Sequence, residues 1–387
     1  MPASKGESLF VNGSTNSAIQ EELTTVFNLK GLNRYPDPHQ LDLKQLLCSF
    51  RNTHTHTSRS LSPDNLFIGV GSDEAIDALL RCFCRPGIDK ILTCPPTYGM
   101  YAVSAQVNDI EVVKVPLDIA NSYALQPDAI NEVLSQDPAI KLFYACSPGN
   151  PTANLVEKNA LIKVLEHPTW NGIVVLDEAY IDFASEGSSL AEWVTEWPNL
   201  VVMQTLSKGF GLAGIRLGAV FTSPPIARLL NSLKAPYNIS SPTSALAISA
   251  LSPKSLGVMR AHRAQILTQR QRMLAELPQI PGIGRHRGGQ DANFLLMEIL
   301  DKPGGRPCNK VALALYEELA EKRGVVVRFR GKELGCEGCL RITVGTEEEV
   351  GRMLVEFQQT LGKIYSEGEG ASSSEEMARE KANDVIA

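Results

Sequence analysis

The feature that most constrains this chain is its alternation of short apolar runs with amphipathic stretches. Seven apolar runs follow one another, at residues 66–70, 90–94, 111–115, 141–146, 173–176, 200–204 and 217–222. Many are apolar along their whole length, which is typical of strands covered on both faces. Stretches of helical period lie between several of them, as at 73–84 and 159–166. This rhythm of βαβ units predicts an α/β fold with a mostly parallel central sheet covered by helices.

The rest of the chain follows other patterns, which divide it into regions. One long helix is expected over 252–277, followed by strands at 293–299, 325–328 and 340–344 and helices at 310–322 and 347–361. We therefore expect a large domain over 31–251, and a linking helix with a smaller C-terminal α+β domain over 252–366. A polar segment precedes them over 1–30, and a Ser/Glu-rich tail without fixed structure is expected over 367–387.

Composition excludes several classes of protein. The 387 residues, 43% of them hydrophobic, suffice for a large core and two domains. A formal charge of -6 disfavours a nucleic-acid surface. No apolar run approaches the roughly 20 residues of a membrane helix, and the polar first ten residues do not form a signal peptide. We expect a cytoplasmic protein that binds neither nucleic acid nor membrane.

The eight cysteines are scattered, which fits a reducing compartment better than a disulfide scaffold. Cys336 and Cys339 form a Cys-x-x-Cys pair, but no second Cys or His pair stands at metal-binding spacing. We interpret the pair as plain thiols and expect no metal site.

Lys208 lies in a stretch, residues 205–216, that is rich in glycine and hydroxyl-bearing side chains. A lysine that forms a Schiff base needs uncrowded backbone and neighbours that hold a phosphate. Thr205 and Ser207 offer hydroxyl hydrogen bonds, and Arg216 offers a charged fork.

Upstream, the apolar run at 173–176 ends in a carboxylate, Asp177, with the phenol of Tyr180 three residues later. A lysine that binds an aldehyde, together with an aspartate for a pyridinium nitrogen, is the protein half of pyridoxal phosphate chemistry. Taken alone, a Ser-Lys-Gly triplet is usually a loop, and Asp-Glu at a strand end is usually solvated. The order and spacing of the two motifs favour the functional interpretation.

In these motifs, and from about residue 31 to about residue 366, the chain resembles the fold type I pyridoxal-phosphate aminotransferases. Among them it is most similar to the histidinol-phosphate aminotransferases of fungal type. The resemblance implies the fold type I architecture and pyridoxal 5'-phosphate as cofactor. It makes Lys208 the cofactor lysine and the base at the substrate Cα, Asp177 the partner of the ring nitrogen, and Tyr180 a donor to the ring oxygen.

Further cofactor ligands follow from the same resemblance. A Gly-Val-Gly-Ser-Asp-Glu turn after the first apolar run opens a helix, and such a turn can bind an anion. The resemblance assigns the cofactor phosphate to Ser72 and Asp73 through their amides, although either residue is also an ordinary helix N-cap. We expect Asp73 to cap the helix. The resemblance also makes Tyr98 the aromatic that stacks on the pyridine ring and Asn150 a donor to the ring oxygen.

Tyr35 belongs to a Tyr-Pro-Asp-Pro stretch that alone indicates a turn. The resemblance makes it the residue that reaches across a subunit interface to the neighbour's cofactor phosphate. It therefore implies a homodimer with shared active sites.

Two arginines, Arg328 and Arg341, each start or end an apolar strand, where a charge is costly unless it meets an anion. A salt bridge at a strand end is the alternative. The resemblance assigns both to the phosphate of the substrate and one of them also to the glutamate carboxylate, and Arg330 could assist. It implies reversible amino transfer between L-histidinol phosphate and 2-oxoglutarate. The products are 3-(imidazol-4-yl)-2-oxopropyl phosphate and L-glutamate, in histidine biosynthesis.

One departure from the resemblance keeps other functions open. The relatives' N-terminal motif, close to Leu-Asp-Ala-Asn-Glu-Asn-Pro-Tyr-Gly, has no match before Asn33. A cofactor-binding but inactive, N-terminally shortened form is therefore one alternative. An aromatic aminotransferase or an amino-acid phosphate decarboxylase of the same fold is another. A nicotinamide-dependent enzyme is disfavoured, because the Gly-Val-Gly turn lacks the third glycine of the dinucleotide fingerprint.

Overall fold

The computed structural model describes residues 32–383, with side chains as far as Glu367. The polar segment expected over 1–30, and with it the region where the Asn-rich motif was sought, lies outside the described residues.

The chain forms two compact units, each with its own sheet. The larger unit extends to Leu267 and also takes in Gly288–Asn293. The smaller unit comprises Thr268–Arg287 and the chain from Phe294 onward. The long helix α9, Pro253–Glu276, thus belongs to the larger unit as far as Leu267 and to the smaller one from Thr268 onward.

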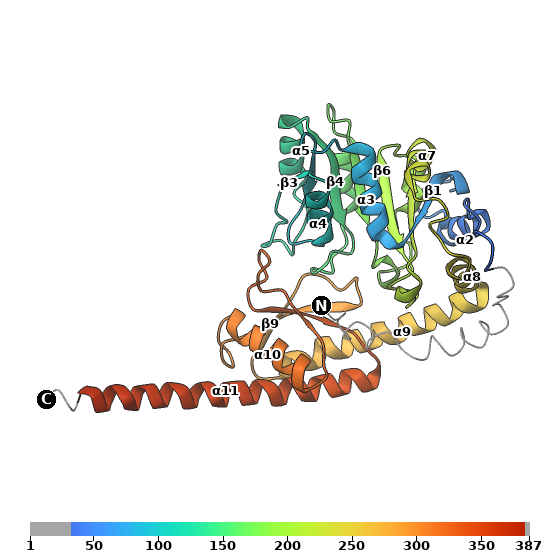
Figure 1. The fold of residues 1–387 in the computed structure, drawn as a ribbon. Helices are drawn as coiled ribbons and strands as arrows, with labels where there is room; N and C mark the ends of the chain where they lie inside the picture. The colour runs from blue at the N-terminus through green and yellow to red at the C-terminus, as the bar shows by residue number, and fades with distance from the viewer. Residues whose placement is uncertain (1–31, 384–387) are drawn as a thin grey trace. The chain divides into compact units, whose positions relative to one another are not determined.

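Seven strands form the sheet of the larger unit, in the order β1-β7-β6-β5-β4-β2-β3 (Figure 1). Their bounds are β1 Leu66–Gly69, β2 Lys90–Thr93, β3 Glu111–Lys114, β4 Ile140–Cys146, β5 Ile173–Asp177, β6 Leu200–Thr205 and β7 Gly218–Thr222. Strand β7 is antiparallel to its neighbours β1 and β6, and the remaining neighbours are parallel. The prediction of a mostly parallel central sheet is confirmed, and the strands match the seven predicted runs to within one residue at each end.

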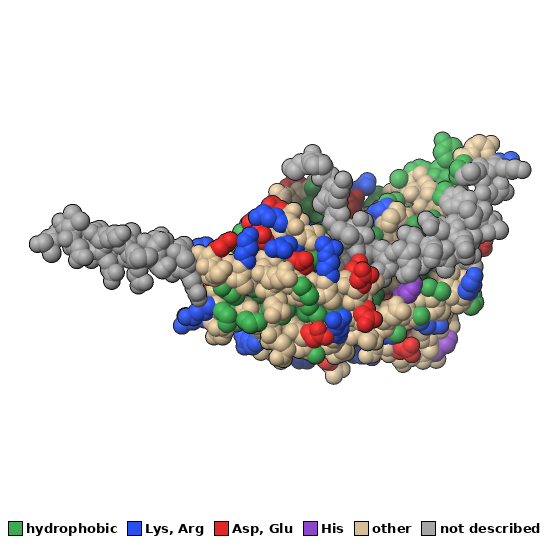
Figure 2. Space-filling model, turned by 90° about the horizontal axis from the view of Figure 1, so that it is seen from below, with side chains coloured by type: hydrophobic (Ala, Val, Ile, Leu, Met, Phe, Trp, Pro, Cys, Tyr) green, Lys and Arg blue, Asp and Glu red, His purple; other side chains and the backbone are tan. Residues whose placement is uncertain are grey.

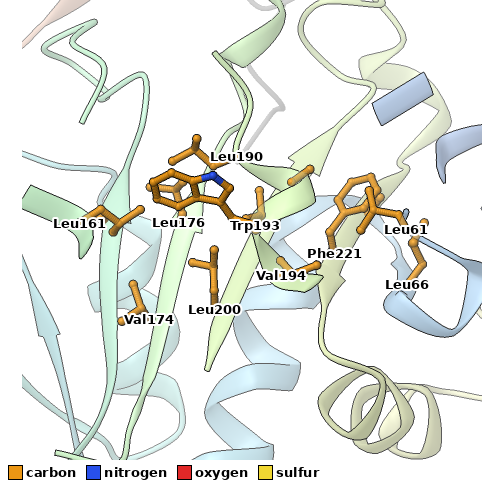
Figure 3. Close-up of a cluster of buried hydrophobic side chains, with 14 of the residues drawn as sticks. Leu61, Leu66, Leu161, Val174, Leu176, Leu190, Trp193, Val194, Leu200 and Phe221 are labelled. Atoms are coloured by element: carbon orange, nitrogen blue, oxygen red, sulfur yellow. The ribbon is translucent and has the colours of Figure 1, made fainter. Parts of the chain in front are cut away.

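Helices cover both faces of this sheet. One set consists of α3 Gly71–Phe83, α4 Met100–Val107 and α7 Pro224–Leu233. The other consists of α2 Leu41–Arg51, α5 Pro127–Gln136, α6 Lys158–Leu165 and α8 Ser241–Ala250. Along β4, Leu142 and Tyr144 join the first core and Phe143 and Ala145 the second, because successive side chains of a strand point to opposite faces. Figure 3 shows Trp193 in the second core. Apolarity along the whole strand is thus explained by burial on both faces.

Single 3-10 turns connect several of these elements. They are η2 Pro63–Asn65, η3 Ile181–Phe183, η4 Ala191–Thr195, η5 Ala213–Ile215 and η6 Leu277–Gln279. Two of them, η3 and η5, follow the strand ends that carry the predicted cofactor residues, so they shape the loops around the candidate site.

The smaller unit has a four-stranded antiparallel sheet in the order β10-β11-β9-β8. Its elements are β8 Ile283–Arg287, β9 Phe294–Ile299, α10 Asn309–Lys322, β10 Arg328–Phe329, β11 Cys339–Thr343 and α11 Glu347–Asn383. The antiparallel strands and the two helices agree with the expected α+β organisation.

The structure departs from the sequence expectations at three elements of the smaller unit. Strand β8, Ile-Gly-Arg-His-Arg, had not been anticipated, because it is mostly polar and lacks an apolar alternation. Strand β10 is only two residues long and begins at Arg328, where the expected strand ended. Helix α11 continues to Asn383 through the tail expected to lack fixed structure. Glu, Ala, Met, Lys and Arg in that stretch favour a helix, whereas Gly368, Gly370 and the serines at 372–374 disfavour one.

None of the helices in residues 32–383 combines the length and apolarity that a bilayer crossing requires. On the face shown in Figure 2, acidic and basic side chains of the described residues are interspersed rather than gathered by sign.

Candidate active site

The carboxyl ends of three adjacent parallel strands, β4, β5 and β6, carry most of the predicted cofactor residues. Asp177 ends β5, and its carbonyl accepts a hydrogen bond from the Ser147 amide (2.8 Å), which follows β4. Lys208 follows β6, and its Nζ lies 5.6 Å from the ring centroid of Tyr180. In α/β sheets, ligands bind at this end of the strands. The structure therefore brings together Lys208, Asp177 and Tyr180, the three candidate catalytic residues of the sequence analysis.

Asp177 is a buried carboxylate, 2% exposed. Its Oδ2 accepts from the Tyr101 hydroxyl (2.6 Å) and its Oδ1 from the Ala179 amide (3.0 Å). Burial raises the pKa of Asp177 above its ordinary value, while both hydrogen bonds and the charge of Lys208 act in the opposite direction. A buried carboxylate in this setting favours a cationic partner.

The loop that carries Lys208 is held by its own hydroxyls. The Thr205 hydroxyl accepts from the Ser207 amide (3.1 Å), donates to the Leu217 carbonyl (3.1 Å) and lies 2.9 Å from Ser207 Oγ. At Gly209, an added Cβ would lie 2.5 Å from Asp182. Glycine is therefore needed next to the lysine, and the hydroxyls fix the backbone that presents it.

A set of hydrogen-bond donors suited to an anion lies where α3 begins, beside Arg216. Gly71 opens α3 with a φ of +73°, and an added Cβ there would lie 2.6 Å from Arg216 Nη2. An added Cβ on Gly218 would lie 2.5 Å from the Gly71 carbonyl carbon and 2.7 Å from the Ser72 amide nitrogen. Glycine at both positions therefore lets β7 and Arg216 approach the first turn of α3 closely, so that a guanidinium lies beside the first amides of the helix. This donor set fits a phosphate.

The expectation that Asp73 caps α3 is wrong. The helix begins two residues earlier, at Gly71, with Val70 as N-cap, and the Glu74 carboxylate accepts from the Val70 amide. The side chain of Asp73 instead pairs with Arg216 (3.4 Å) and accepts from the Tyr98 hydroxyl (3.3 Å). The left-handed backbone of Gly71 lets the strand turn directly into the helix, which moves its start upstream.

Tyr98 and Asn150 flank the same region. The Tyr98 ring lies edge-on to that of Tyr101, with centroids 5.6 Å apart. Burial raises the pKa of Tyr98, and the nearby charge of Asp73 adds to the rise, so the phenol stays protonated. Asn150 is buried in the turn after β4. That turn is closed by Ala153, which has a φ of +57°, a left-handed conformation that glycine adopts with less strain.

Tyr35 lies on the surface, 82% exposed, with its ring stacked on that of Tyr237 (4.6 Å, 22°). The sequence analysis did not identify Tyr237, which has a positive φ of 57°. Its neighbour Asn238 donates to the Ile68 carbonyl (3.1 Å), which ties this aromatic pair to the larger unit.

In the smaller unit, Arg328 and Arg341 occupy directly facing positions of β10 and β11. The Arg341 guanidinium also lies 4.9 Å from the ring centroid of Phe294. Like charges at facing positions are destabilising unless an anion lies between them. Arg330, suggested as an assistant, forms an ion pair with Glu333 (2.9 Å).

A buried charged network that sequence reasoning missed supports the strand ends. Arg51 of α2 donates to Gln204 (2.7 Å) and pairs with Asp182 (2.7 Å). Gln204 donates in turn to Glu178 (2.8 Å), whose other oxygen accepts from the Leu190 amide (2.7 Å). Burial raises the pKa of Glu178. These partners are too far apart in the chain for a local motif to reveal them.

Cys336 and Cys339 are both buried, and burial raises the pKa of the Cys339 thiol. Within the part of the chain that the structure describes, no cluster of three or more His, Cys, Asp or Glu residues is arranged to hold a metal ion. Buried thiols with a raised pKa have the character of structural rather than reactive cysteines.

Comparison with known proteins places this geometry in a family. The family described as aminotransferase class I and II matches residues 4–357, and the chain belongs to this family. Histidinol-phosphate aminotransferase of Schizosaccharomyces pombe is 57% identical over 335 residues, which cover 86% of this chain and 87% of that protein. The enzyme of the same name from Saccharomyces cerevisiae is 48% identical over 344 residues, 87% of each chain.

Solved structures share the fold. Histidinol-phosphate aminotransferase from Sinorhizobium meliloti, in complex with pyridoxal-5'-phosphate, has a TM-score of 0.77 at 21% identity. The match covers 90% of this chain and 88% of that one. The enzyme of the same name from Clostridium acetobutylicum has a TM-score of 0.75 at 22% identity, covering 89% and 95% of the two chains. The fold type I architecture is therefore confirmed.

Proposed function

We propose that this protein is a pyridoxal-phosphate-dependent aminotransferase of histidine biosynthesis. It transfers an amino group reversibly between L-histidinol phosphate and 2-oxoglutarate. The observation that carries the proposal is that Lys208 meets the buried Asp177 and Tyr180 at the strand ends, in a chain 57% identical to a histidinol-phosphate aminotransferase. The enzyme is a cytoplasmic homodimer with shared active sites.

The residues fit the cofactor. The first amides of α3, with Arg216 beside them, suit its phosphate, and the buried Asp177 suits a cationic ring nitrogen. When bound, pyridoxal phosphate supplies a ring that takes up the electron pair left when the substrate Cα–H bond breaks. The residues that would hold it are Ser72, Asp73, Tyr98, Asn150, Asp177, Tyr180, Thr205, Ser207, Lys208, Arg216 and, from the other subunit, Tyr35.

Lys208 holds the cofactor between turnovers and then acts as the base. Its Nζ removes the proton from the substrate Cα and returns a proton at the neighbouring carbon of the cofactor. Tyr180 lies beside Lys208 Nζ and donates its phenol to the ring oxygen. The hydroxyl-braced loop keeps the amine in place for both proton transfers.

Arg328 and Arg341 bind the anionic end of each substrate. Their facing positions in neighbouring strands put both side chains on one face of the sheet, where a phosphate or a carboxylate can accept hydrogen bonds from two guanidinium groups. One anion site thus serves histidinol phosphate in one half-reaction and glutamate in the other.

The direct test is to assay purified protein with histidinol phosphate and 2-oxoglutarate and to measure the glutamate formed. An aromatic aminotransferase would prefer phenylalanine or tyrosine as donor. A decarboxylase would release carbon dioxide from an amino-acid phosphate, and a cofactor-binding but inactive chain would bind pyridoxal phosphate without turnover. Preference for any of those substrates, or no turnover by the loaded protein, would overturn the proposal.

A further inference from the structure

Tyr101 is a fully buried tyrosine whose hydroxyl contacts the carboxylate assigned to the cofactor ring. It lies in the first turn of α4, and its hydroxyl donates to Asp177 Oδ2 at 2.6 Å. The Ala179 amide takes the other oxygen, Oδ1. Each carboxylate oxygen therefore already accepts one protein hydrogen bond and keeps lone-pair capacity for a further donor.

The Tyr101 ring is fixed by its surroundings. It stacks on Tyr144, with centroids 4.8 Å apart, and meets the edge-on ring of Tyr98. The Cys146 thiol also lies beside its hydroxyl. Burial raises the pKa of Tyr101 well above its ordinary value, so the phenol stays protonated and acts as a donor. These contacts fix the orientation of the hydroxyl toward Asp177.

We propose that Tyr101 is a positioning residue that keeps the shared proton on the cofactor's ring nitrogen, by stabilising the negative charge of Asp177. The inference rests on the proposed partnership of Asp177 with that nitrogen. The nitrogen and the carboxylate share one proton, and the proton resides on the group of higher affinity. Burial raises the proton affinity of Asp177, whereas a donor to its charged form lowers it. Tyr101 thus shifts the shared proton from Asp177 toward the ring nitrogen, and the protonated ring is the form that accepts electrons.

The neighbouring Tyr144 offers a matched control. It is equally buried and stacks on Tyr101, but its hydroxyl makes no hydrogen bond to any described residue. Tyr101→Phe and Tyr144→Phe each remove one oxygen from the same aromatic stack. Only the first removes a donor to Asp177.

The experiment loads the full-length apoprotein with pyridoxal phosphate carrying nitrogen-15 in the ring. The nitrogen-15 chemical shift and the cofactor dissociation constant are measured for the wild type, Tyr101→Phe, Tyr144→Phe and Asp177→Asn. We expect the Tyr101→Phe signal to move toward that of neutral pyridine. The ratio of protonated to neutral ring falls about tenfold or more, because a hydrogen bond to a charged group exceeds one pKa unit in free energy. Tyr144→Phe retains the wild-type signal.

Each result decides one question. A wild-type signal in Tyr101→Phe, with a shifted signal in Asp177→Asn, overturns the role of Tyr101 and leaves that of Asp177 intact. A wild-type signal in Asp177→Asn overturns the assignment of Asp177 and the inference with it. If Tyr101→Phe does not fold, 3-fluorotyrosine at position 101 keeps the ring and strengthens the donor. In that protein the nitrogen-15 chemical shift of the cofactor ring should equal the wild-type shift or lie further from that of neutral pyridine. A shift closer to neutral pyridine overturns the proposal.

Discussion

At the scale of single residues, the site depends on charged groups held in low-dielectric surroundings. Lys208 is presented by a loop in which Thr205 and Ser207 bond to each other, and it faces Tyr180 and the buried Asp177. Both the lysine and the aspartate were predicted from the sequence, because each directly follows an apolar strand of a parallel sheet. Carboxyl ends of neighbouring parallel strands share one edge, so proximity follows from topology.

Replacing Lys208 by alanine should abolish covalent cofactor attachment and reduce turnover by at least about a hundredfold, the lower end of what a positioned acid–base group contributes. Borohydride reduction of the loaded wild type followed by peptide mapping should label Lys208. The exposed Lys163, which pairs with Asp128, provides the control, and Lys163→Ala should behave as the wild type. Label on a different lysine would contradict the assignment.

Asp177 predicts a pH dependence of stability in the apoprotein. Its folded-state pKa is raised by burial, so the folded protein binds its proton more tightly than the unfolded chain. The corresponding stability is present below the ordinary carboxyl pKa and is lost as the pH rises through the raised value. Asp177→Asn removes this loss. Urea unfolding should be measured for both proteins across that pH window. As the pH rises, the free energy of unfolding of Asp177→Asn should increase relative to that of the wild type. A difference that does not change with pH would contradict the prediction.

At the scale of elements, the buried strands could be predicted from the sequence more readily than the exposed ones. All seven strands of the larger sheet were located. Six of them are largely buried and form apolar runs, whereas the edge strand β3 is only partly buried. Strand β8 was missed because it is polar, and the contact between Tyr101 and Asp177 was missed because 76 positions separate the residues. The pair Arg51–Asp182 spans 131 positions. Such contacts arise from tertiary packing, which a local pattern does not encode.

The facing strands β10 and β11 predict a shared anion site. Arg341→Ala should weaken both histidinol phosphate and glutamate, by about 2–5 kcal/mol in kcat/KM, since each loses a charge-assisted partner. Arg285→Ala, at an exposed arginine of β8 in the same sheet, is the matched control and should leave both values unchanged. Comparable loss in the two variants would mean that overall charge of the unit, rather than the facing pair, sets affinity.

At the scale of the whole molecule, Tyr35 connects the single chain to the proposed dimer. Its ring is 82% exposed and stacks on Tyr237, so the described residues of this chain do not bury it. An aromatic residue in this position is available to a second copy of the chain. If it reaches the other subunit's cofactor phosphate, each active site uses Lys208 of one chain and Tyr35 of the other.

Mixing two inactive variants tests this arrangement. A hybrid of a Lys208→Ala chain and a Tyr35→Ala chain carries both lesions in one site and leaves the other site intact. Random exchange should restore about a quarter of wild-type activity, because half of the dimers are hybrids with one intact site of two. Activity should be measured at limiting cofactor, where loss of a phosphate ligand inactivates the Tyr35 variant most fully. If tagged chains prove that exchange occurred and activity stays absent, Tyr35 serves its own subunit and the shared site is wrong.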